Sequence, residues 1–132
     1  SRAQLVEQRI RPALARGELV AADRFVSSTL AYQGAAGGMP IKDITDVARV
    51  ALQGCTPDLV VVFDVDEATA LKRMSPLLDR MEAKGSEFHR RVRQGYLEQV
   101  ASDAVHFRKI DATLTEEQVW VALMAVLRQK FG

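Results

Sequence analysis

Residues 59–63 form an uninterrupted apolar run, Leu-Val-Val-Val-Phe, and this run restricts the fold more than any other part of the chain. The run continues after one aspartate to Val65. β-Branched and aromatic residues without polar alternation are typical of a strand that is buried on both faces of a parallel sheet. Such a strand needs helices on both sides of it. The run therefore predicts an α/β fold with a strand over residues 59–65.

The rest of the chain alternates between strand-like and helix-like patterns. Weaker strand patterns cover residues 18–22 and 104–110. Helical spacing of apolar residues is found in 2–16, 27–33, 41–52, 67–74, 82–102 and 116–130. Pro12 should distort the first helix, Gly17 should end it, and Thr115 should cap the last. We predict one domain over residues 1–132, with three parallel strands, flanking helices and a site at one end of the strands.

Charge and cysteine content exclude several classes of partner. The 18 Lys and Arg residues nearly balance the 17 Asp and Glu residues, and the net charge is +1. Bulk electrostatics therefore indicate neither a nucleic acid nor a membrane partner. The longest apolar run is far shorter than the roughly 20 residues that cross a bilayer. The single cysteine, Cys55, agrees with a reducing compartment, so we expect a cytoplasmic location.

The segment 23–34 holds the densest group of chemically useful side chains. Asp23 and Arg24 follow the predicted strand 18–22, and an arginine at the end of a strand suits a phosphate group. An aspartate beside it can hold a magnesium-bound water. If the segment continues as a helix, Ser28, Thr29, Tyr32 and Gln33 lie at three-to-four spacing and could recognise a base edge. The alternative, a surface Asp-Arg pair with Tyr32 packed in the core, is the one that spacing alone favours.

The motifs in this segment and beyond it resemble those of bacterial-type thymidylate kinases. The central signature is Asp23-Arg24-Phe25, then Ser28-Thr29 and Ala31-Tyr32-Gln33-Gly34, with Gly37-Gly38 after it. Further motifs follow in the family's order: Pro57-Asp58-Leu59, Phe63-Asp64-Val65, Asp79-Arg80-Met81-Glu82, Phe88, Val92-Arg93 with Gly95-Tyr96, and Ile110-Asp111-Ala112. The resemblance implies a P-loop nucleoside monophosphate kinase fold and ATP-dependent phosphorylation of dTMP to dTDP with Mg²⁺.

The same resemblance implies a role for each dTMP-side residue. Asp23 would lie near the reacting phosphates and, through a water molecule, the magnesium ion. Arg24 would hold the dTMP phosphate. Tyr96 would lie against the sugar and exclude a ribose hydroxyl. The remaining substrate-binding residues would surround the thymine and the nucleoside: Ser28, Thr29, Tyr32 and Gln33.

On the ATP side, residues 72–82 resemble the mobile lid of the family. Arg73 would lie close to the ATP base, Asp79 and Arg80 would order the far end of the lid, and Asp111 and Ala112 would belong to the loop that cradles the adenine. The lid departs from the pattern, because residues 74–78 are Met-Ser-Pro-Leu-Leu and lack the arginines of many relatives. A lid arginine that acts on the transferred phosphate and an apolar lid that only covers the site both remain open.

A phosphate-binding loop needs glycines followed by a lysine and a hydroxyl residue, and no segment of the chain has this pattern. The glycine-rich residues 34–38 lack such a lysine and are better interpreted as a turn. We therefore expect a carboxyl-terminal fragment whose central P-loop strand is missing, which would leave two apolar strand edges open. In the family the dimer interface is helical, and the helices at 5–14 and 44–52 are apolar enough to form a homodimer. The alternative to a thymidylate kinase is a noncatalytic nucleotide-binding or dimerisation protein. A third possibility is a related nucleoside kinase that phosphorylates a sugar hydroxyl.

Overall fold

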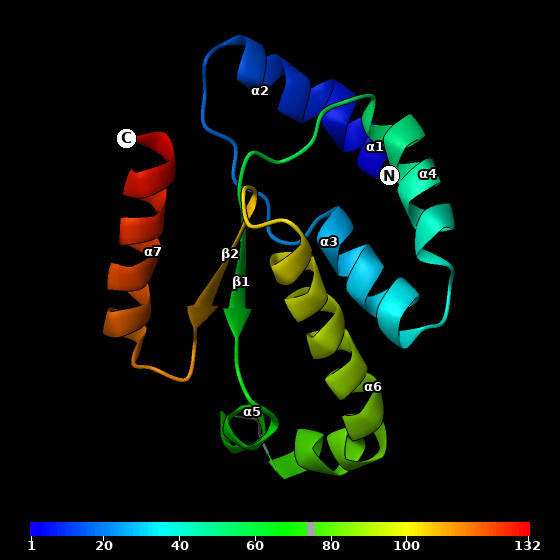
Figure 1. Cartoon of the computed structure of the whole chain (residues 1–132), viewed down its shortest axis with the longest axis vertical. Helices are drawn as coiled ribbons and strands as arrows, with labels where there is room; N and C mark the ends of the chain where they lie inside the picture. Colours follow the sequence, from blue (N-terminus) through cyan, green and yellow to red (C-terminus); the bar gives the residue numbers. More distant parts are fainter. Residues whose placement is uncertain (74–75) are drawn as a thin grey trace.

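The computed structural model describes residues 1–73 and 76–132, and it describes side chains for residues 1–73 and 85–132. Helices and strands alternate as in an α/β fold (Figure 1). In chain order the elements, with η for π-helical segments, are α1 (Arg2–Leu5), η1 (Val6–Ile10), α2 (Arg11–Ala15), α3 (Val26–Thr29), η2 (Leu30–Ala36), α4 (Ile41–Leu52), β1 (Val60–Asp64), α5 (Glu67–Arg73), α6 (Pro76–Ser102), β2 (Phe107–Asp111) and α7 (Glu116–Phe131).

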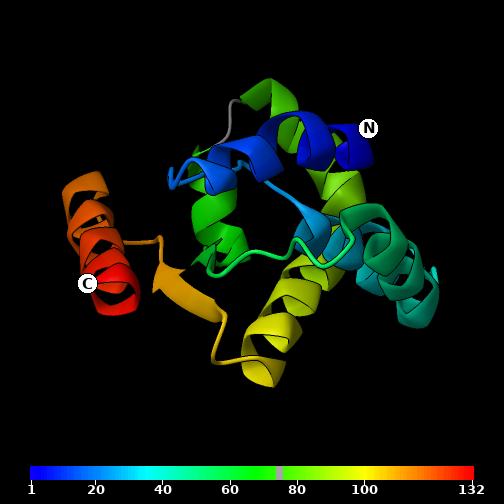
Figure 2. The ribbon, with the colours of Figure 1, turned by 90° about the horizontal axis from the view of Figure 1, so that it is seen from above.

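A parallel pair of strands lies between two layers of helix. β1 pairs with β2 from Val60 opposite Phe107 to Asp64 opposite Asp111. α7 lies on one side of the pair and α6 on the other, as both views show (Figures 1 and 2). Val62 and Ile110 are buried in the strands. The parallel register places both aspartates at the same end of the sheet, where the predicted site should be.

The third strand predicted at residues 18–22 is not formed. This segment belongs to no helix or strand, and Leu19 is 74% exposed. A strand exists only where its amides and carbonyls meet those of a neighbour, and no described segment pairs with this one. β2 also begins later than predicted, because the Asp103 carboxylate accepts a hydrogen bond from the His106 amide at 3.2 Å and closes a turn there.

The first helix shows both predicted irregularities. Its middle part, η1, is π-helical, and the Arg11 amide donates to the carbonyl of Val6. The wider turn lies immediately before Pro12, whose ring excludes a regular α-helical turn. The helix then ends at Gly17, which has a φ of 79° that residues with a side chain rarely adopt.

The main helical core lies between η2 and α6. It contains Ala31, Ala36 and Val92, with Tyr32 and Tyr96 packed against it. α6 approaches η2 closely at Gly95, where an added Cβ would lie 3.1 Å from the Cα of Ala31 and 2.7 Å from the Cβ of Ala35. Only glycine permits this approach without moving the helices apart.

The last helix begins where its capping pattern predicts. α7 begins at the predicted capping box, in which the Thr115 hydroxyl accepts from the Gln118 amide at 3.2 Å. The predicted lid, residues 72–82, spans the end of α5 and the start of α6. The side chains of Asp79 and Arg80 lie outside the described residues. No helix in the described ranges is long and apolar enough to cross a membrane.

Candidate functional site

Arg24 lies in a bend between the irregular segment 18–22 and α3. Its φ is 65°, a left-handed conformation that costs free energy in a residue with a side chain. The turn places the guanidinium carbon 4.6 Å from the centre of the Tyr32 ring, within the range of a cation–π interaction. The Nε atom of Arg24 also donates to the Ser28 hydroxyl at 3.3 Å. Arg24 is thus held by its own backbone, a ring and a hydroxyl.

Helix α6 contributes Tyr96 to the same group of side chains. The hydroxyl groups of Tyr96 and Ser28 share a hydrogen bond of 2.7 Å, although 68 residues separate them. A second link between α6 and α3 is the hydrogen bond that the side-chain amide of Gln99 donates to the Ser27 carbonyl, at 3.0 Å. The Tyr96 hydroxyl, followed by Tyr32, raises the pKa of Arg24. The guanidinium therefore stays charged in a place where its direction is fixed.

These side chains surround a hollow of about 460 Å³, which we call the Arg24 hollow. It is lined by Arg2, Arg24, Ser28, Thr29, Tyr32 and Gln33. The five predicted residues of segment 23–34 other than Asp23 thus line one hollow, while Tyr96 borders it through Ser28, Arg24 and the Tyr32 ring. Its lining offers guanidinium, hydroxyl, phenol and amide groups and no carboxylate. This arrangement suits an anion joined to a flat polar group.

Arg2 is a lining residue that sequence reasoning missed. Its guanidinium donates a hydrogen bond to the Thr29 hydroxyl, 27 residues further along the chain. No local pattern marks Arg2, because it stands in the first turn of an ordinary amphipathic helix. Only the packing of that helix against α3 and α4 brings it to the hollow.

Asp23 lies beside the hollow without lining it. Its side chain is exposed and has no hydrogen bond or ion pair with any described residue. In the described ranges, no three His, Cys, Asp or Glu side chains are close enough together to hold a metal ion directly. Mg²⁺ commonly keeps several waters and is held by one or two carboxylates together with substrate phosphates. A free carboxylate next to an anion site fits such a water-mediated role.

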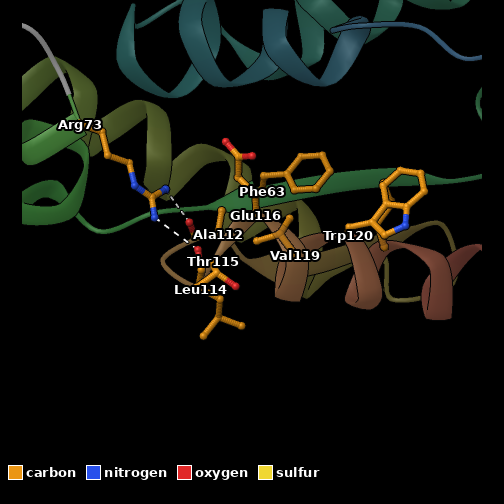
Figure 3. Close-up of a pocket in the computed structure, with 9 residues that line it drawn as sticks. Phe63, Arg73, Ala112, Leu114, Thr115, Glu116, Val119 and Trp120 are labelled. Carbon is orange, nitrogen blue, oxygen red and sulfur yellow. Dashed lines mark hydrogen bonds between the residues drawn. The ribbon is translucent and has the colours of Figure 1, made fainter.

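A second hollow, of about 660 Å³, is lined by residues of β1, α5, α7 and the loop after β2, and we call it the Arg73 hollow (Figure 3). It is lined by Phe63, Arg73, Ala112, Leu114, Thr115, Glu116, Val119, Trp120 and Leu123. Arg73 reaches from α5 to the loop after β2 and donates to the carbonyls of Ala112 at 2.6 Å and Thr113 at 3.2 Å. The structure therefore brings together the predicted residues Arg73, Asp111 and Ala112.

Asp111 shapes this loop from within. Its carboxylate accepts hydrogen bonds from the Thr113 hydroxyl at 2.5 Å and the Thr113 amide at 2.9 Å. The hydroxyl, followed by the amide, lowers the pKa of Asp111. The amide of Ala112 donates to the Asp64 carbonyl at 2.8 Å. The loop is consequently fixed to the ends of both strands, with its next carbonyls turned toward Arg73.

The apolar end of the Arg73 hollow contains a tryptophan that helical spacing predicts to be buried. Helical spacing in α7 suggests that Trp120 packs in a core with Leu123, Met124 and Leu127, yet Trp120 is 60% exposed while the other three are half-buried. Phe63, from the strand with the strongest apolar pattern, is 50% exposed on the same hollow. Their rings stand at the end of the hollow away from Arg73 (Figure 3). No described element covers either ring fully.

An ion pair between β1 and α6 is another feature that the sequence does not reveal. Arg93 Nε lies 2.8 Å from Asp64 Oδ1, and Arg93 Nη2 lies 3.1 Å from Asp64 Oδ2. This two-pronged geometry is the strongest form of such a pair. Asp64 raises the pKa of Arg93, with a smaller contribution from Asp66. Both residues belong to motifs of the family resemblance, but their spacing of 29 residues gives no sign that they meet.

Comparisons with known proteins point to a single family. The family model for thymidylate kinase matches residues 1–122. The chain is 43% identical to a thymidylate kinase of Finegoldia magna over 98% of this chain and 64% of the relative. It is 38% identical to one of Desulforudis audaxviator over 98% of this chain and 61% of the relative, and 39% identical to one of Deinococcus radiodurans over 98% and 64%.

A solved structure shows the same fold. The crystal structure of thymidylate kinase from Ehrlichia chaffeensis superposes with a TM-score of 0.75 at 25% identity, over 96% of this chain and 58% of that one. This likeness confirms the predicted fold class. The chain spans between 58% and 64% of the length of these relatives. The family model, the sequence identities and the shared fold together establish that the chain belongs to the thymidylate kinase family.

Proposed function

We propose that the full-length protein is a thymidylate kinase, which transfers the terminal phosphoryl group of ATP to the phosphate of dTMP. In this reaction an oxygen of the dTMP phosphate forms a new bond to the γ-phosphorus, the bond from that phosphorus to the β-phosphate oxygen breaks, and the products are dTDP and ADP. The observation that carries the proposal is the Arg24 hollow, with a guanidinium fixed between the Tyr32 ring and the Ser28 hydroxyl, in a chain of this family.

The acceptor phosphate is assigned to Arg24. In phosphoryl transfer most of the catalysis comes from positioning and from neutralising charge on the phosphates. A guanidinium that is already oriented loses little freedom when it binds the phosphate. Arg2, the second cation of the hollow, adds positive charge on the side of Thr29. Both arginines favour an anionic acceptor over a neutral nucleoside.

The nucleoside part of dTMP is assigned to the polar and aromatic lining of the hollow. Thr29 and Gln33 supply hydrogen-bonding groups for the thymine edge, and Tyr32 supplies a ring wall. Ser28 links Arg24 to Tyr96 and so holds the phosphate side and the sugar side together. Tyr96, whose ring lies against that of Tyr32, is proposed to exclude a ribose 2′-hydroxyl by its bulk.

ATP is assigned to the side of the Arg73 hollow. Arg73 and the loop at Asp111 and Ala112 would border the adenine, with the carbonyls and amides of the loop available for recognition. Asp79 and Arg80 are proposed to order the lid, whose closure would exclude water and prevent hydrolysis of ATP. Because Arg73 is bonded to backbone carbonyls, the lid and the loop are joined before any nucleotide binds.

Magnesium, when bound with ATP, would neutralise charge on the phosphates and orient them for in-line transfer. Asp23 is the described residue that would hold it, through a water molecule, since its carboxylate is exposed and free of hydrogen bonds and ion pairs within the described ranges. Arg24, next in sequence, would then keep the acceptor phosphate near that charge. With magnesium bound, Asp23 would orient the water, and Arg24 would orient the acceptor.

We also propose a homodimer in the cytoplasm, where ATP and dTMP are available. Helix α4 leaves Val47 and Val50 70% and 76% exposed, and the first helix leaves Leu5 and Leu14 42% and 47% exposed. Apolar side chains on neighbouring helices of this kind are typical of a surface that is covered in an assembly. Sedimentation of the full-length protein would show one species of twice the chain mass, and a purely monomeric species at micromolar concentration would refute the dimer.

The proposed function is tested by the intact mass of the purified full-length protein and a transfer assay on the same sample. ATP, Mg²⁺ and dTMP should give dTDP and ADP in equal amounts, and omission of dTMP should leave ATP intact. dCMP serves as a control acceptor and should react far more slowly. Absence of dTDP from a correctly folded sample of confirmed mass would sink the kinase assignment and favour a noncatalytic nucleotide-binding or dimerisation role.

A further inference from the structure

Asp64 connects three parts of the molecule. It is the last residue of β1, its carboxylate holds Arg93 of α6 with two contacts, and its carbonyl accepts the Ala112 amide at 2.8 Å. The carboxylate is largely buried, with a side chain 14% exposed, while Arg93 is 43% exposed. Side chain and main chain of one residue thus hold a helix on one side and a loop on the other.

Each of these contacts leads to one of the two hollows. Arg93 lies three residues before Tyr96 on the same helix, and the Tyr96 hydroxyl meets Ser28 at 2.7 Å on the edge of the Arg24 hollow. Ala112 lies in the Arg73 hollow, and its carbonyl accepts from Arg73 at 2.6 Å. The path from Tyr96 through α6, Arg93, Asp64 and Ala112 to Arg73 therefore joins the hollows through described contacts.

A second acidic residue strengthens this junction. Asp66 lies directly before α5, where its carboxylate accepts from the Thr69 amide at 2.7 Å, and Arg73 is the last residue of the same helix. Asp66 also interacts with Arg93 through charge, without a direct ion pair. Arg93 consequently lies between the end of β1 and the start of the helix that carries Arg73.

We propose that Arg93 and Asp64 form a positioning pair that sets the distance between the acceptor-side and the donor-side hollow. The inference rests on the proposed function for its kinetic meaning, since an in-line transfer depends on where the two phosphates lie relative to each other. Neither residue needs to touch a substrate. A pair of this kind contributes to the transfer step and little to the binding of either nucleotide alone, because each hollow keeps its own lining.

The kinetic test uses Arg93→Ala in the full-length protein, with Arg91→Ala as matched control. Arg91 is exposed on α6, and the Glu87 carboxylate with which it pairs, at 3.4 Å, is on the same helix. A small misplacement of reacting groups costs up to about 100-fold, so we expect the single-turnover rate of Arg93→Ala to fall about 10- to 100-fold. The dissociation constants of ATP and dTMP, each measured alone, should change by less than about threefold, because uniform binding is not affected.

Milder variants separate positioning from loss of folding. Arg93→Lys keeps the charge without the two-pronged contact and should recover part of the rate. Asp64→Asn should lower the rate, and Asp64→Asn combined with Arg93→Ala should be no slower than Arg93→Ala alone, since the partners act as a unit. A normal rate in Arg93→Ala, or additive losses in the double variant, would overturn the proposal.

Amide exchange tests the pair independently of catalysis. Hydrogen exchange of the Ala112 amide, followed by NMR in the nucleotide-free full-length protein, should be about tenfold faster in Arg93→Ala than in Arg91→Ala, because the Asp64 carbonyl is no longer held. Equal exchange in the two variants would refute the coupling even if the protein proves inactive on dTMP. If exchange responds and no dTDP forms from the wild type, the pair stands and the kinase assignment fails.

Discussion

The Arg24 hollow and the Arg73 hollow are built from different kinds of contact. In the Arg24 hollow, side chains hold other side chains: a guanidinium lies over a phenol ring and bonds a hydroxyl, which bonds a second phenol. In the Arg73 hollow, the arginine donates to main-chain carbonyls of the loop after β2. The first arrangement depends on which residues are present, and the second depends mainly on where the backbone runs.

This difference predicts how each hollow should respond to mutation. A substitution in the Arg24 hollow removes a chemical group that has no substitute, while one in the loop at residues 111–114 leaves the carbonyls in place. We therefore expect large effects on the Arg24 side and smaller ones on the Arg73 side.

The largest effect is expected for Arg24→Ala. Removal of a preorganised donor to a transferring group costs about 100- to 1000-fold in turnover, and the same loss is expected here. Alanine has a Cβ as arginine does, so the left-handed backbone at φ 65° is equally strained in both proteins. Rapid-quench measurement of dTDP formation checks the prediction.

Arg9→Ala is the matched control, because Arg9 is exposed on the first helix and does not line the hollow. It should keep the wild-type rate. Turnover of Arg24→Ala close to that of Arg9→Ala would refute the assignment of the acceptor phosphate.

The next effect concerns the packing that delivers Tyr96 to the hollow. In Gly95→Ala the new methyl group would lie 2.7 Å from the Cβ of Ala35 and 3.1 Å from the Cα of Ala31. Overpacking of this kind costs about 1–3 kcal/mol of unfolding free energy. Urea denaturation checks the value, and dTDP formation should fall as α6 moves away from Ser28.

Gly85→Ala on the same helix serves as the comparison. Among the residues whose side chains are described, an added Cβ there meets the His89 ring alone, at 3.4 Å, so the helix should gain stability from alanine. An equal stability change in the two variants would contradict the close packing at Gly95.

A smaller effect is expected for sugar selection. Tyr96→Ala should raise the ratio of activity on ribo-substrates to activity on dTMP by about tenfold, the discrimination that a modest steric gap provides. Tyr96→Phe keeps the ring and loses the hydroxyl that contacts Ser28 and Arg24, so its ratio should equal that of the wild type even if its rate falls. Steady-state rates with both acceptors give the ratio. An unchanged ratio in Tyr96→Ala would exclude the steric role and leave Tyr32, which lines the hollow, as the aromatic residue to examine.

The smallest effect is predicted for the loop of the Arg73 hollow. Thr113→Val removes the hydroxyl that is the main cause of the lowered pKa of Asp111, so this pKa should rise toward its ordinary value. A carboxyl group with a lowered folded-state pKa contributes stability that is present above its unfolded pKa and is lost as the pH falls through the folded one. Acid unfolding of the variant should therefore begin at a slightly higher pH.

NMR titration of the Asp111 side-chain carbon measures the shift directly. Thr45→Val is the control, since the Thr45 hydroxyl donates to the Ile41 carbonyl at 2.9 Å and is far from Asp111 in the chain. Transfer activity should be nearly unchanged in both variants. A large loss of activity in Thr113→Val would show that the loop recognises its ligand through side chains after all.

The local features of the chain could be predicted because neighbouring residues decide them. Gly17 ends a helix, Thr115 caps one, and residues 60–63 of the apolar run form most of a strand, each for reasons contained in a few adjacent residues. The segment from Asp23 to Gln33 could be singled out in the same way. Most of its candidate residues come to one hollow because a helix places residues three and four apart on one face.

The strand predicted at residues 18–22 shows where local reasoning fails. Its pattern is apolar enough for a strand, but strand formation requires a partner that supplies hydrogen bonds, and no described segment does so. Local reasoning fails in the same way for Trp120 in a helix. Its spacing predicts burial, but its neighbours leave it 60% exposed.

The fold class, the family resemblance and the candidate residues of the Arg24 segment follow from the sequence alone, because they depend on short-range patterns and on motif order. Contacts between distant groups depend on the tertiary structure: Arg2 meets Thr29 across 27 residues, Arg93 meets Asp64 across 29, and Arg73 meets the Ala112 carbonyl across 39. Those contacts depend on how the helices pack against the sheet and on close approaches such as the one at Gly95. Such packing is a property of the whole chain, since the free energy of each contact is available only after the chain between the partners has been ordered.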